Sequence, residues 1–163
     1  MNYRIITIPE SVTSRVRADG RDPVYNHPAH SEIATGYGPC RQCLGFFEVG
    51  VDRRILFTHD TFLGVDSLRQ PGPVFIHQES CLQYDGSRGF PPHLSEHALT
   101  LEAYGKGKQL RASRSLTAGQ VETAEGGIKE LLGLSGVDYI IVRDTSAGCF
   151  DCAIVRDSDE EYL

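Results

Sequence analysis

The sequence has no excess of basic residues, no long hydrophobic run and no basic leader at its N-terminus. Its 163 residues include 22 aspartates and glutamates against 16 lysines and arginines, so the formal net charge is −6. General nucleic-acid binders and proteins that dock on anionic membranes carry basic patches, so this balance argues against both kinds of partner. No stretch approaches the roughly 20 apolar residues of a membrane-spanning helix, and no signal peptide is recognisable. We therefore expect a cytoplasmic protein.

Established catalytic signatures are missing as well. The chain contains no G-x-S-x-G elbow, no phosphate-binding P-loop and no H-E-x-x-H zinc motif. The sequence therefore gives no indication of a serine hydrolase, a P-loop nucleotide-binding protein or a metalloprotease, the classes that these motifs define. Whether the protein is an enzyme stays open at this point.

Length and charge distribution predict a single folded body. Domains commonly have about 100–150 residues. Four of the acidic residues fall within residues 157–163, and without them the acidic and basic residues nearly balance. We therefore predict one domain over residues 1–156 and a flexible acidic tail over residues 157–163.

Alternating and β-branched segments predict strands, separated by turns that are rich in glycine and proline. These segments are residues 3–8, 53–62, 73–77, 98–104, 109–116, 137–143 and 150–156. Apolar residues at helical spacing predict one principal helix over residues 118–132. Residues 9–38 show little periodicity and are predicted as a long irregular loop with at most a short helix near residues 11–17. The scarcity of helices between strands favours an α+β fold, a mainly antiparallel sheet with the helix 118–132 packed on it.

The cysteines carry the strongest chemical signal. Cys40 and Cys43 form one C-x-x-C pair, and Cys149 and Cys152 form a second pair with the same spacing. Two residues between two thiols let both sulfurs reach one tetrahedral metal ion. Paired cysteines in a reducing compartment indicate metal or redox chemistry more often than structural disulfides. The two pairs therefore predict a structural zinc site with four thiolate ligands. An iron–sulfur cluster, disulfide bonds between the pairs, and simple burial of the thiols stay open as alternatives.

His77 and the fifth cysteine, Cys81, stand four residues apart in the segment FIHQESCLQY. Imidazole nitrogen and thiolate sulfur are both zinc ligands, so these two residues are candidate additional ligands of the same site.

Two other interpretations of these residues remain open. In the first, the protein is a thiol-dependent redox or group-transfer enzyme, with Cys40 or Cys149 as the attacking thiolate and His77 as a further catalytic candidate. In the second, it is a binding or accessory module without catalysis, whose loop 9–38 becomes ordered on a partner. The sequence leaves open whether that partner is a small molecule or a protein, and it does not determine the oligomeric state.

Three segments resemble a known bacterial family. They are GPCRQCL at residues 38–44, GPVFIHQESCLQY at residues 72–84 and VDYIIVRDTSAGCFDCAIVR at residues 137–156. In order and separation they resemble the family called domain of unknown function 1203. The resemblance implies no particular biochemical activity. Many members carry only the cysteines that match Cys40 and Cys149. The resemblance therefore implies a site centred on these two residues, with His77 beside them.

Overall fold

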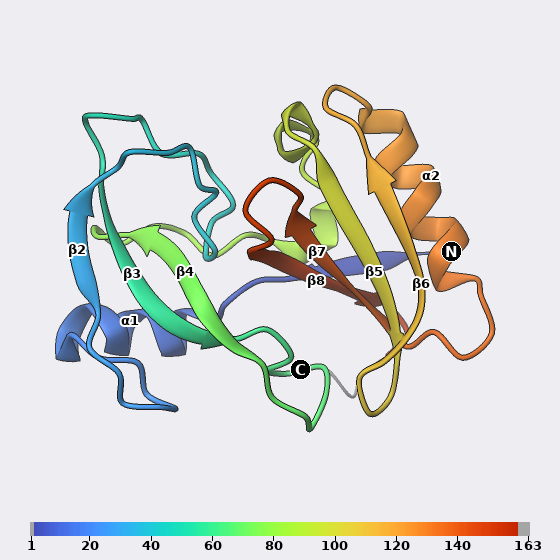
Figure 1. Ribbon diagram of the computed structural model, residues 1–163, viewed down its shortest axis with the longest axis horizontal. Helices are drawn as coiled ribbons and strands as arrows, with labels where there is room; N and C mark the ends of the chain where they lie inside the picture. Colours follow the sequence, from blue (N-terminus) through green and yellow to red (C-terminus); the bar gives the residue numbers. More distant parts are fainter. Residues whose placement is uncertain (1, 160–163) are drawn as a thin grey trace. The chain divides into compact units, whose positions relative to one another are not determined.

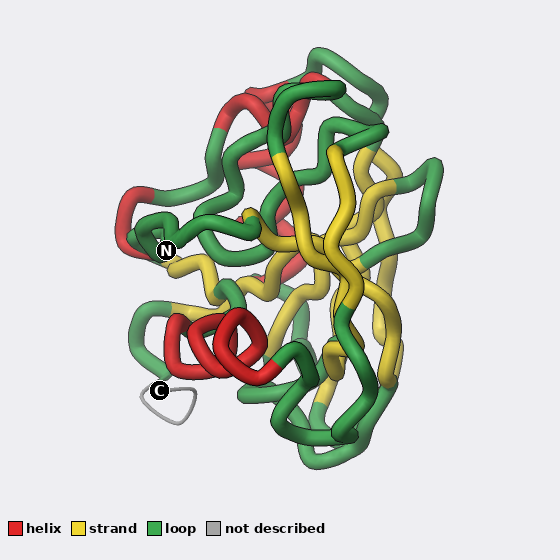
Figure 2. The backbone as a smooth tube through the Cα atoms, turned by 90° about the vertical axis from the view of Figure 1, so that its left-hand side faces the viewer, coloured by secondary structure: helices red, strands yellow, loops and turns green. Residues whose placement is uncertain are grey.

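The computed structural model describes residues 2–159 and divides into two compact units. Unit 1 comprises Met1–Ile6, Thr61–Gln70 and Asp85–Leu163, and unit 2 comprises Thr7–Asp60 and Pro71–Tyr84. Loops make up much of the chain between the helices and strands, as Figure 2 shows in green. The two units are described separately below.

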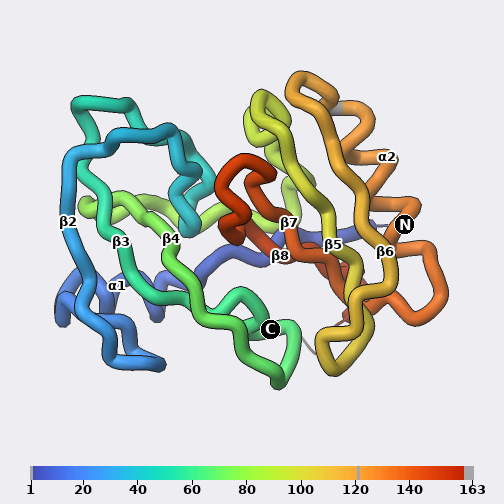
Figure 3. Tube along the Cα trace, viewed as in Figure 1, coloured from blue at the N-terminus to red at the C-terminus, as the bar shows by residue number. Residues whose placement is uncertain are grey.

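Unit 1 is built on a five-stranded antiparallel sheet with the strand order β1-β8-β7-β5-β6 (Figure 1). The strands are β1 (Tyr3–Ile6), β5 (Leu99–Gly105), β6 (Gln109–Leu116), β7 (Tyr139–Asp144) and β8 (Phe150–Arg156). The first strand of the chain pairs with the last, so the blue strand β1 runs beside the red strand β8 in Figure 3. Two short 3₁₀ helices, η1 (Gly86–Arg88) and η2 (Pro92–Glu96), precede β5.

The core of unit 1 lies around the neighbouring strands β7 and β8. All residues of β7 except Arg143 are buried, and all residues of β8 except Arg156 are buried. A strand that is buried on both faces is apolar at nearly every position rather than alternating. This explains the continuous apolar run Tyr139–Val142. Helix α2 (Val121–Leu132) contacts β5, β6 and β7, and its Ile128 and Leu132 are completely buried.

The backbones of η1 and β1 approach each other so closely at Gly86 that no side chain fits there. A Cβ atom on Gly86 would overlap the carbonyl oxygen of Ile5 and lie 3.0 Å from its carbonyl carbon. The backbone of β1 is held by its pairing with β8 and cannot yield easily. We therefore expect Gly86→Ala to lower the free energy of unfolding by about 2–3 kcal/mol, measured by urea titration.

Gly126, inside α2, is the matched control for this prediction. A Cβ atom there meets nothing within 4 Å. Because alanine has the higher helix propensity, Gly126→Ala is expected to raise the free energy of unfolding by about 0.5–1 kcal/mol. Equal urea midpoints for the two variants would contradict the steric argument.

Unit 2 combines a three-stranded antiparallel sheet, in the order β2-β3-β4, with one helix. Its elements are α1 (Glu10–Asp19), β2 (His30–Ile33), β3 (Arg53–Asp60) and β4 (Pro71–His77). All four residues of the edge strand β2 are exposed, and only Thr13 and Val16 are buried in α1. The apolar core of this unit comes mainly from β3, β4 and the loops, and its larger buried side chains are Ile8, Leu44, Phe47, Ile55, Phe57, Val74 and Ile76.

The α+β fold with mainly antiparallel sheets is confirmed, and α2 is the principal helix predicted over residues 118–132. The short turn between segments 98–104 and 109–116 predicts a hairpin, and the short connection between 137–143 and 150–156 predicts an antiparallel pair. Both are confirmed, as β5–β6 and β7–β8. Within residues 9–38, α1 covers and extends the short helix expected near residues 11–17, whereas the strand β2 was not expected from the sequence. Neither element buries enough apolar side chains to leave a periodic pattern in the sequence.

Two other expectations concern the extent of the fold. The single domain over residues 1–156 remains a prediction. Of the acidic tail predicted over residues 157–163, positions 160–163 lie outside the described residues. Within residues 2–159, neither helix combines the length and the apolar character that crossing a bilayer requires.

Candidate metal centre

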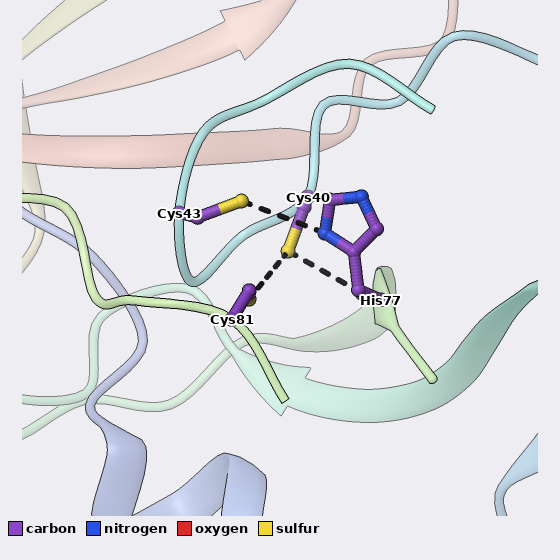
Figure 4. A group of neighbouring side chains, drawn as sticks. All are labelled: Cys40, Cys43, His77 and Cys81. Carbon is purple, nitrogen blue, oxygen red and sulfur yellow. Dashed lines mark hydrogen bonds between the residues drawn. The ribbon is translucent and has the colours of Figure 1, made fainter. Parts of the chain in front are cut away.

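Four side chains of unit 2 converge on one point. They belong to Cys40, Cys43, His77 and Cys81 (Figure 4), and their ligating atoms all lie within 4.8 Å of one another. The structure therefore brings together the first C-x-x-C pair and the two candidate additional ligands. Three sulfurs and one imidazole nitrogen in this arrangement could hold a metal ion.

The first C-x-x-C pair sits in a tight turn that presents both sulfurs on one side. The Cys40 N–H donates to the Gly45 carbonyl at 2.9 Å, and the Leu44 N–H donates to the Cys40 carbonyl at 2.8 Å. The Gly45 N–H points at the Cys43 sulfur at 3.4 Å. Leu44 has a φ of 60° and a buried side chain. Leucine thus occupies the left-handed position after the second cysteine, where glycine is usual.

This turn is joined to the β4 strand by its backbone. The Arg41 N–H donates to the Phe75 carbonyl at 3.0 Å, and the Arg41 carbonyl accepts from the Ile8 N–H at 3.0 Å. Gly38, before the turn, has a φ of 97°, and a Cβ atom on it would lie 2.8 Å from the Phe47 ring. The turn is therefore fixed against both the strand and the buried ring of Phe47.

His77 ends β4 and faces the turn. Its backbone N–H donates to the Cys40 sulfur at 3.4 Å, and its ring Nδ1 lies 3.5 Å from the Cys43 sulfur. The imidazole packs edge-on against Phe47, with 4.7 Å between the ring centroids. Because Nδ1 is the nitrogen that faces the thiols (Figure 4), it is the atom that would bind a metal.

Cys81 reaches the cluster from the irregular segment that follows β4. Its sulfur lies 3.9 Å from that of Cys40. Arg17 of α1 holds this side of the cluster by donating twice to the His77 carbonyl, at 2.9 and 3.1 Å, and by contacting the Cys81 sulfur at 3.7 Å. The same guanidinium donates to the Gln42 side chain, whose amide donates to the Cys81 carbonyl, both at 2.8 Å.

The proximity of the four groups changes their protonation. Hydrogen bonds from the Cys43 and Cys81 thiols, reinforced by His77, hold the pKa of the Cys40 thiol well below its usual value. The Cys43 pKa is raised because that thiol shares its proton with Cys40. Hydrogen bonding to Cys40, and then to Cys81, raises the pKa of His77 to about 10. Without a metal, the cluster thus favours a thiolate at Cys40 beside an imidazolium at His77.

The second C-x-x-C pair belongs to unit 1. Cys149 is half-buried in the turn before β8, with its sulfur 3.8 Å from the Ala147 carbonyl, and Cys152 is completely buried in β8. Neither is a member of the cluster of four. The site with four cysteines therefore stays a prediction, and the cluster in unit 2 is a different ligand set.

Arg17 is the contact that sequence reasoning missed. It lies at the end of the short helix expected near residues 11–17, and an arginine there carries no recognisable signal of its partners. Its role depends on contacts with His77 and Cys81, which are about sixty residues away in the chain.

His59, a further histidine of unit 2, lies outside this cluster. Burial lowers its pKa to about 4, and the Arg41 charge adds to this effect against the opposing influence of Asp60. In the unfolded chain its pKa is about 6.5. As the pH falls below about 6.5, His59 becomes protonated in the unfolded chain but stays neutral in the folded protein until the pH approaches 4.

We therefore expect the free energy of unfolding to fall by about 1.4 kcal/mol per pH unit between about pH 6.5 and pH 4 relative to His59→Gln. Above about pH 6.5 the difference between the two proteins is expected to be constant. Urea titrations of both proteins across this range measure it, and acid effects that both share cancel. Parallel pH profiles would show that His59 titrates normally.

Comparison with known proteins connects the cluster to a family. A family model described as "protein of unknown function (DUF1203)" matches residues 37–156, which include all four cluster residues and the second C-x-x-C pair. No curated protein and no solved structure matches the chain. The match covers most of the chain and agrees with the three segments that showed the resemblance, so the chain belongs to the DUF1203 family of proteins of unknown function.

Proposed function

We propose that Cys40, Cys43, Cys81 and His77 form a structural zinc site that holds unit 2 together. The observation that carries this proposal is the separation of the ligating atoms. Around a tetrahedral zinc ion with Zn–S bonds of about 2.3 Å and Zn–N bonds of about 2.0–2.1 Å, two sulfurs lie about 3.8 Å apart and a sulfur and a nitrogen about 3.5 Å apart. The Cys40–Cys81 sulfurs are 3.9 Å apart, and the Cys43 sulfur is 3.5 Å from His77 Nδ1.

The chemistry of the donors supports zinc and a structural role. Thiolate and imidazole are soft and borderline ligands, which zinc accepts in four-coordinate sites. Four protein ligands leave no position open for a substrate or a reactive water, as a catalytic zinc site would. The Gly45 N–H and the His77 N–H both point at ligand sulfurs, an arrangement that orients them and balances part of their negative charge.

A bound zinc ion would supply stability that a unit as small as unit 2 needs. The unit has about 70 residues, a range in which an apolar core rarely supplies more than about 3–5 kcal/mol and in which small proteins often rely on a metal. The zinc would tie the turn 40–45 to the end of β4 and to the segment after it. Thiolate ligands of this kind stay reduced in the cytoplasm, so the proposal includes a cytoplasmic location.

The burial of Cys40 favours this proposal over a thiol-dependent enzyme. A nucleophilic thiolate must meet its substrate, yet Cys40 is completely buried. Its low pKa is explained by its neighbours in the cluster, which are themselves zinc ligands.

Metal analysis of the purified protein tests the proposal. We expect one zinc ion per chain, and we expect Cys43→Ser to lose it. Cys149→Ser is the matched control, because it removes a half-buried thiol from the second C-x-x-C pair, and we expect it to keep the full zinc content. A parent protein without zinc would refute the proposal, and loss of zinc in Cys149→Ser would favour the ligand set of four cysteines.

A further inference from the structure

The three cysteines of the cluster differ in their access to solvent and in their surroundings. Cys40 is completely buried, whereas Cys43 and Cys81 are half-buried. Cys43 is held inside the turn, where its sulfur contacts the Gly45 N–H and His77 Nδ1. Cys81 lies in a segment without helix or strand, between the exposed residues Ser80 and Leu82. Of the three thiols, Cys81 is thus the one on the irregular, solvent-facing side of the cluster.

A second thiol lies within reach of Cys81. The sulfurs of Cys40 and Cys81 are 3.9 Å apart, so a movement of about 2 Å would bring them to the length of a disulfide bond. The segment that carries Cys81 is held by the Gln42 and Arg17 side chains, whereas the turn that carries Cys40 is held by a backbone hydrogen bond to β4. Because side chains can change rotamer, the Cys81 segment can make this movement more easily than the turn.

We propose that Cys81 is an oxidation site through which a hydroperoxide opens the metal centre and joins Cys40 to Cys81 in a disulfide. This inference rests on the proposed zinc site. It adds a modification site and a mode of regulation that a purely structural zinc would not have.

The reaction proceeds in two steps. The Cys81 thiolate attacks hydrogen peroxide, the O–O bond breaks, one oxygen stays on sulfur as a sulfenic acid, and the other leaves as hydroxide. The Cys40 thiolate then attacks the Cys81 sulfur, the S–O bond breaks, and a second hydroxide leaves as the S–S bond forms. Two thiolates lose two electrons in total, and one peroxide molecule accepts them.

The disulfide removes two of the four zinc ligands. Cys43 and His77 remain, and two protein ligands do not complete a closed tetrahedral site. Zinc therefore leaves as Cys40 and Cys81 are joined, while Cys43 becomes a free thiol. A dithiol reductant in the presence of zinc restores the original centre.

Treatment of the zinc-loaded protein with hydrogen peroxide tests this inference. Zinc release is followed with a chromophoric chelator, and the cysteines are identified by alkylation and peptide mass spectrometry. We expect one Cys40–Cys81 disulfide for each zinc released and an alkylated Cys43. A Cys40–Cys43 disulfide as the main product, or retention of zinc while other thiols oxidise, would overturn the inference.

Two variants sharpen the test. Cys81→His keeps four potential ligands but removes the thiol that reacts first, so we expect it to bind zinc and to lose peroxide-driven release. Cys149→Ser leaves the cluster intact, so we expect zinc release and the Cys40–Cys81 disulfide as in the parent. Zinc release from Cys81→His at the parent rate would also contradict the inference. A parent protein that holds no zinc before oxidation would instead refute the proposed function itself, so the two failures are distinguishable.

Discussion

Removal of zinc with a strong chelator is expected to unfold unit 2 while the five-stranded sheet of unit 1 stays folded. All four proposed ligands belong to unit 2, and none belongs to unit 1. Structural zinc sites contribute on the order of 10 kcal/mol to folding in small zinc-binding peptides. This exceeds what a core of unit 2's size supplies by itself, so the loss of the metal is expected to cost unit 2 its folded state.

Hydrogen exchange measured by mass spectrometry checks this result strand by strand. After chelation, amides of β3 and β4 are expected to exchange freely, whereas amides of the buried strands β7 and β8 keep their protection. Addition of zinc is expected to restore the protection of β3 and β4.

Two variants serve as controls for the chelation experiment. Cys43→Ser is expected to behave as the chelated parent without any chelator, and Cys149→Ser is expected to behave as the zinc-loaded parent. If β3 and β4 keep full protection after every zinc ion has been removed, the metal has no structural role.

Loss of the Arg17 guanidinium is expected to weaken zinc binding by about 10–100-fold, the usual effect of removing a group that orients metal ligands. Arg17 donates to the His77 carbonyl and to the Gln42 side chain, and it contacts the Cys81 sulfur. It thus connects the turn, the end of β4 and the irregular segment, which carry the four ligands between them.

Charge gives a second reason for this effect. Three thiolates and one neutral imidazole around Zn²⁺ leave a net charge of −1 at the centre. The Arg17 cation lies 3.7 Å from one of these sulfurs and balances that charge in a half-buried environment. A positive charge at this place favours the zinc-bound state over the metal-free state, in which His77 is itself protonated.

The experiment compares Arg17→Gln with Arg15→Gln in competition with a chromophoric chelator. Arg15 is an exposed arginine of the same helix, so its replacement makes the same change of net charge away from the cluster. Arg17→Lys keeps the positive charge but lacks the planar guanidinium group with its several N–H donors. We therefore expect this variant to recover only part of the zinc affinity lost in Arg17→Gln.

The spectrum of the cobalt-substituted protein separates positioning from a change of ligands. At saturation we expect Arg17→Gln to show the same tetrahedral thiolate spectrum as the parent, although more cobalt is needed to reach it. Equal zinc affinities of Arg17→Gln and Arg15→Gln would show that Arg17 does not support the site.

The sequence predicted most of unit 1 because its signals are local. The hydrophobic face of α2 repeats at helical spacing, and the segments that became β5–β8 alternate or are apolar over the length of a strand. In unit 2 this information is weak. The α1 helix buries only Thr13 and Val16, so the sequence indicated no more than a short helix near residues 11–17, and β2 buries nothing, so no periodicity marks it.

By itself, the sequence determined the α+β class, the principal helix, the strand pairs that close unit 1, and the pairing of Cys40 with Cys43 as neighbouring candidate ligands. It also marked His77 and Cys81 as candidate ligands. Only the tertiary structure decided that these two residues lie with Cys40 and Cys43, whereas Cys149 and Cys152 belong to another unit. The physical reason is that a C-x-x-C turn is set by neighbouring residues, while the full ligand set depends on the pairing of β3 with β4 and on the contacts of Arg17, between residues far apart in the chain.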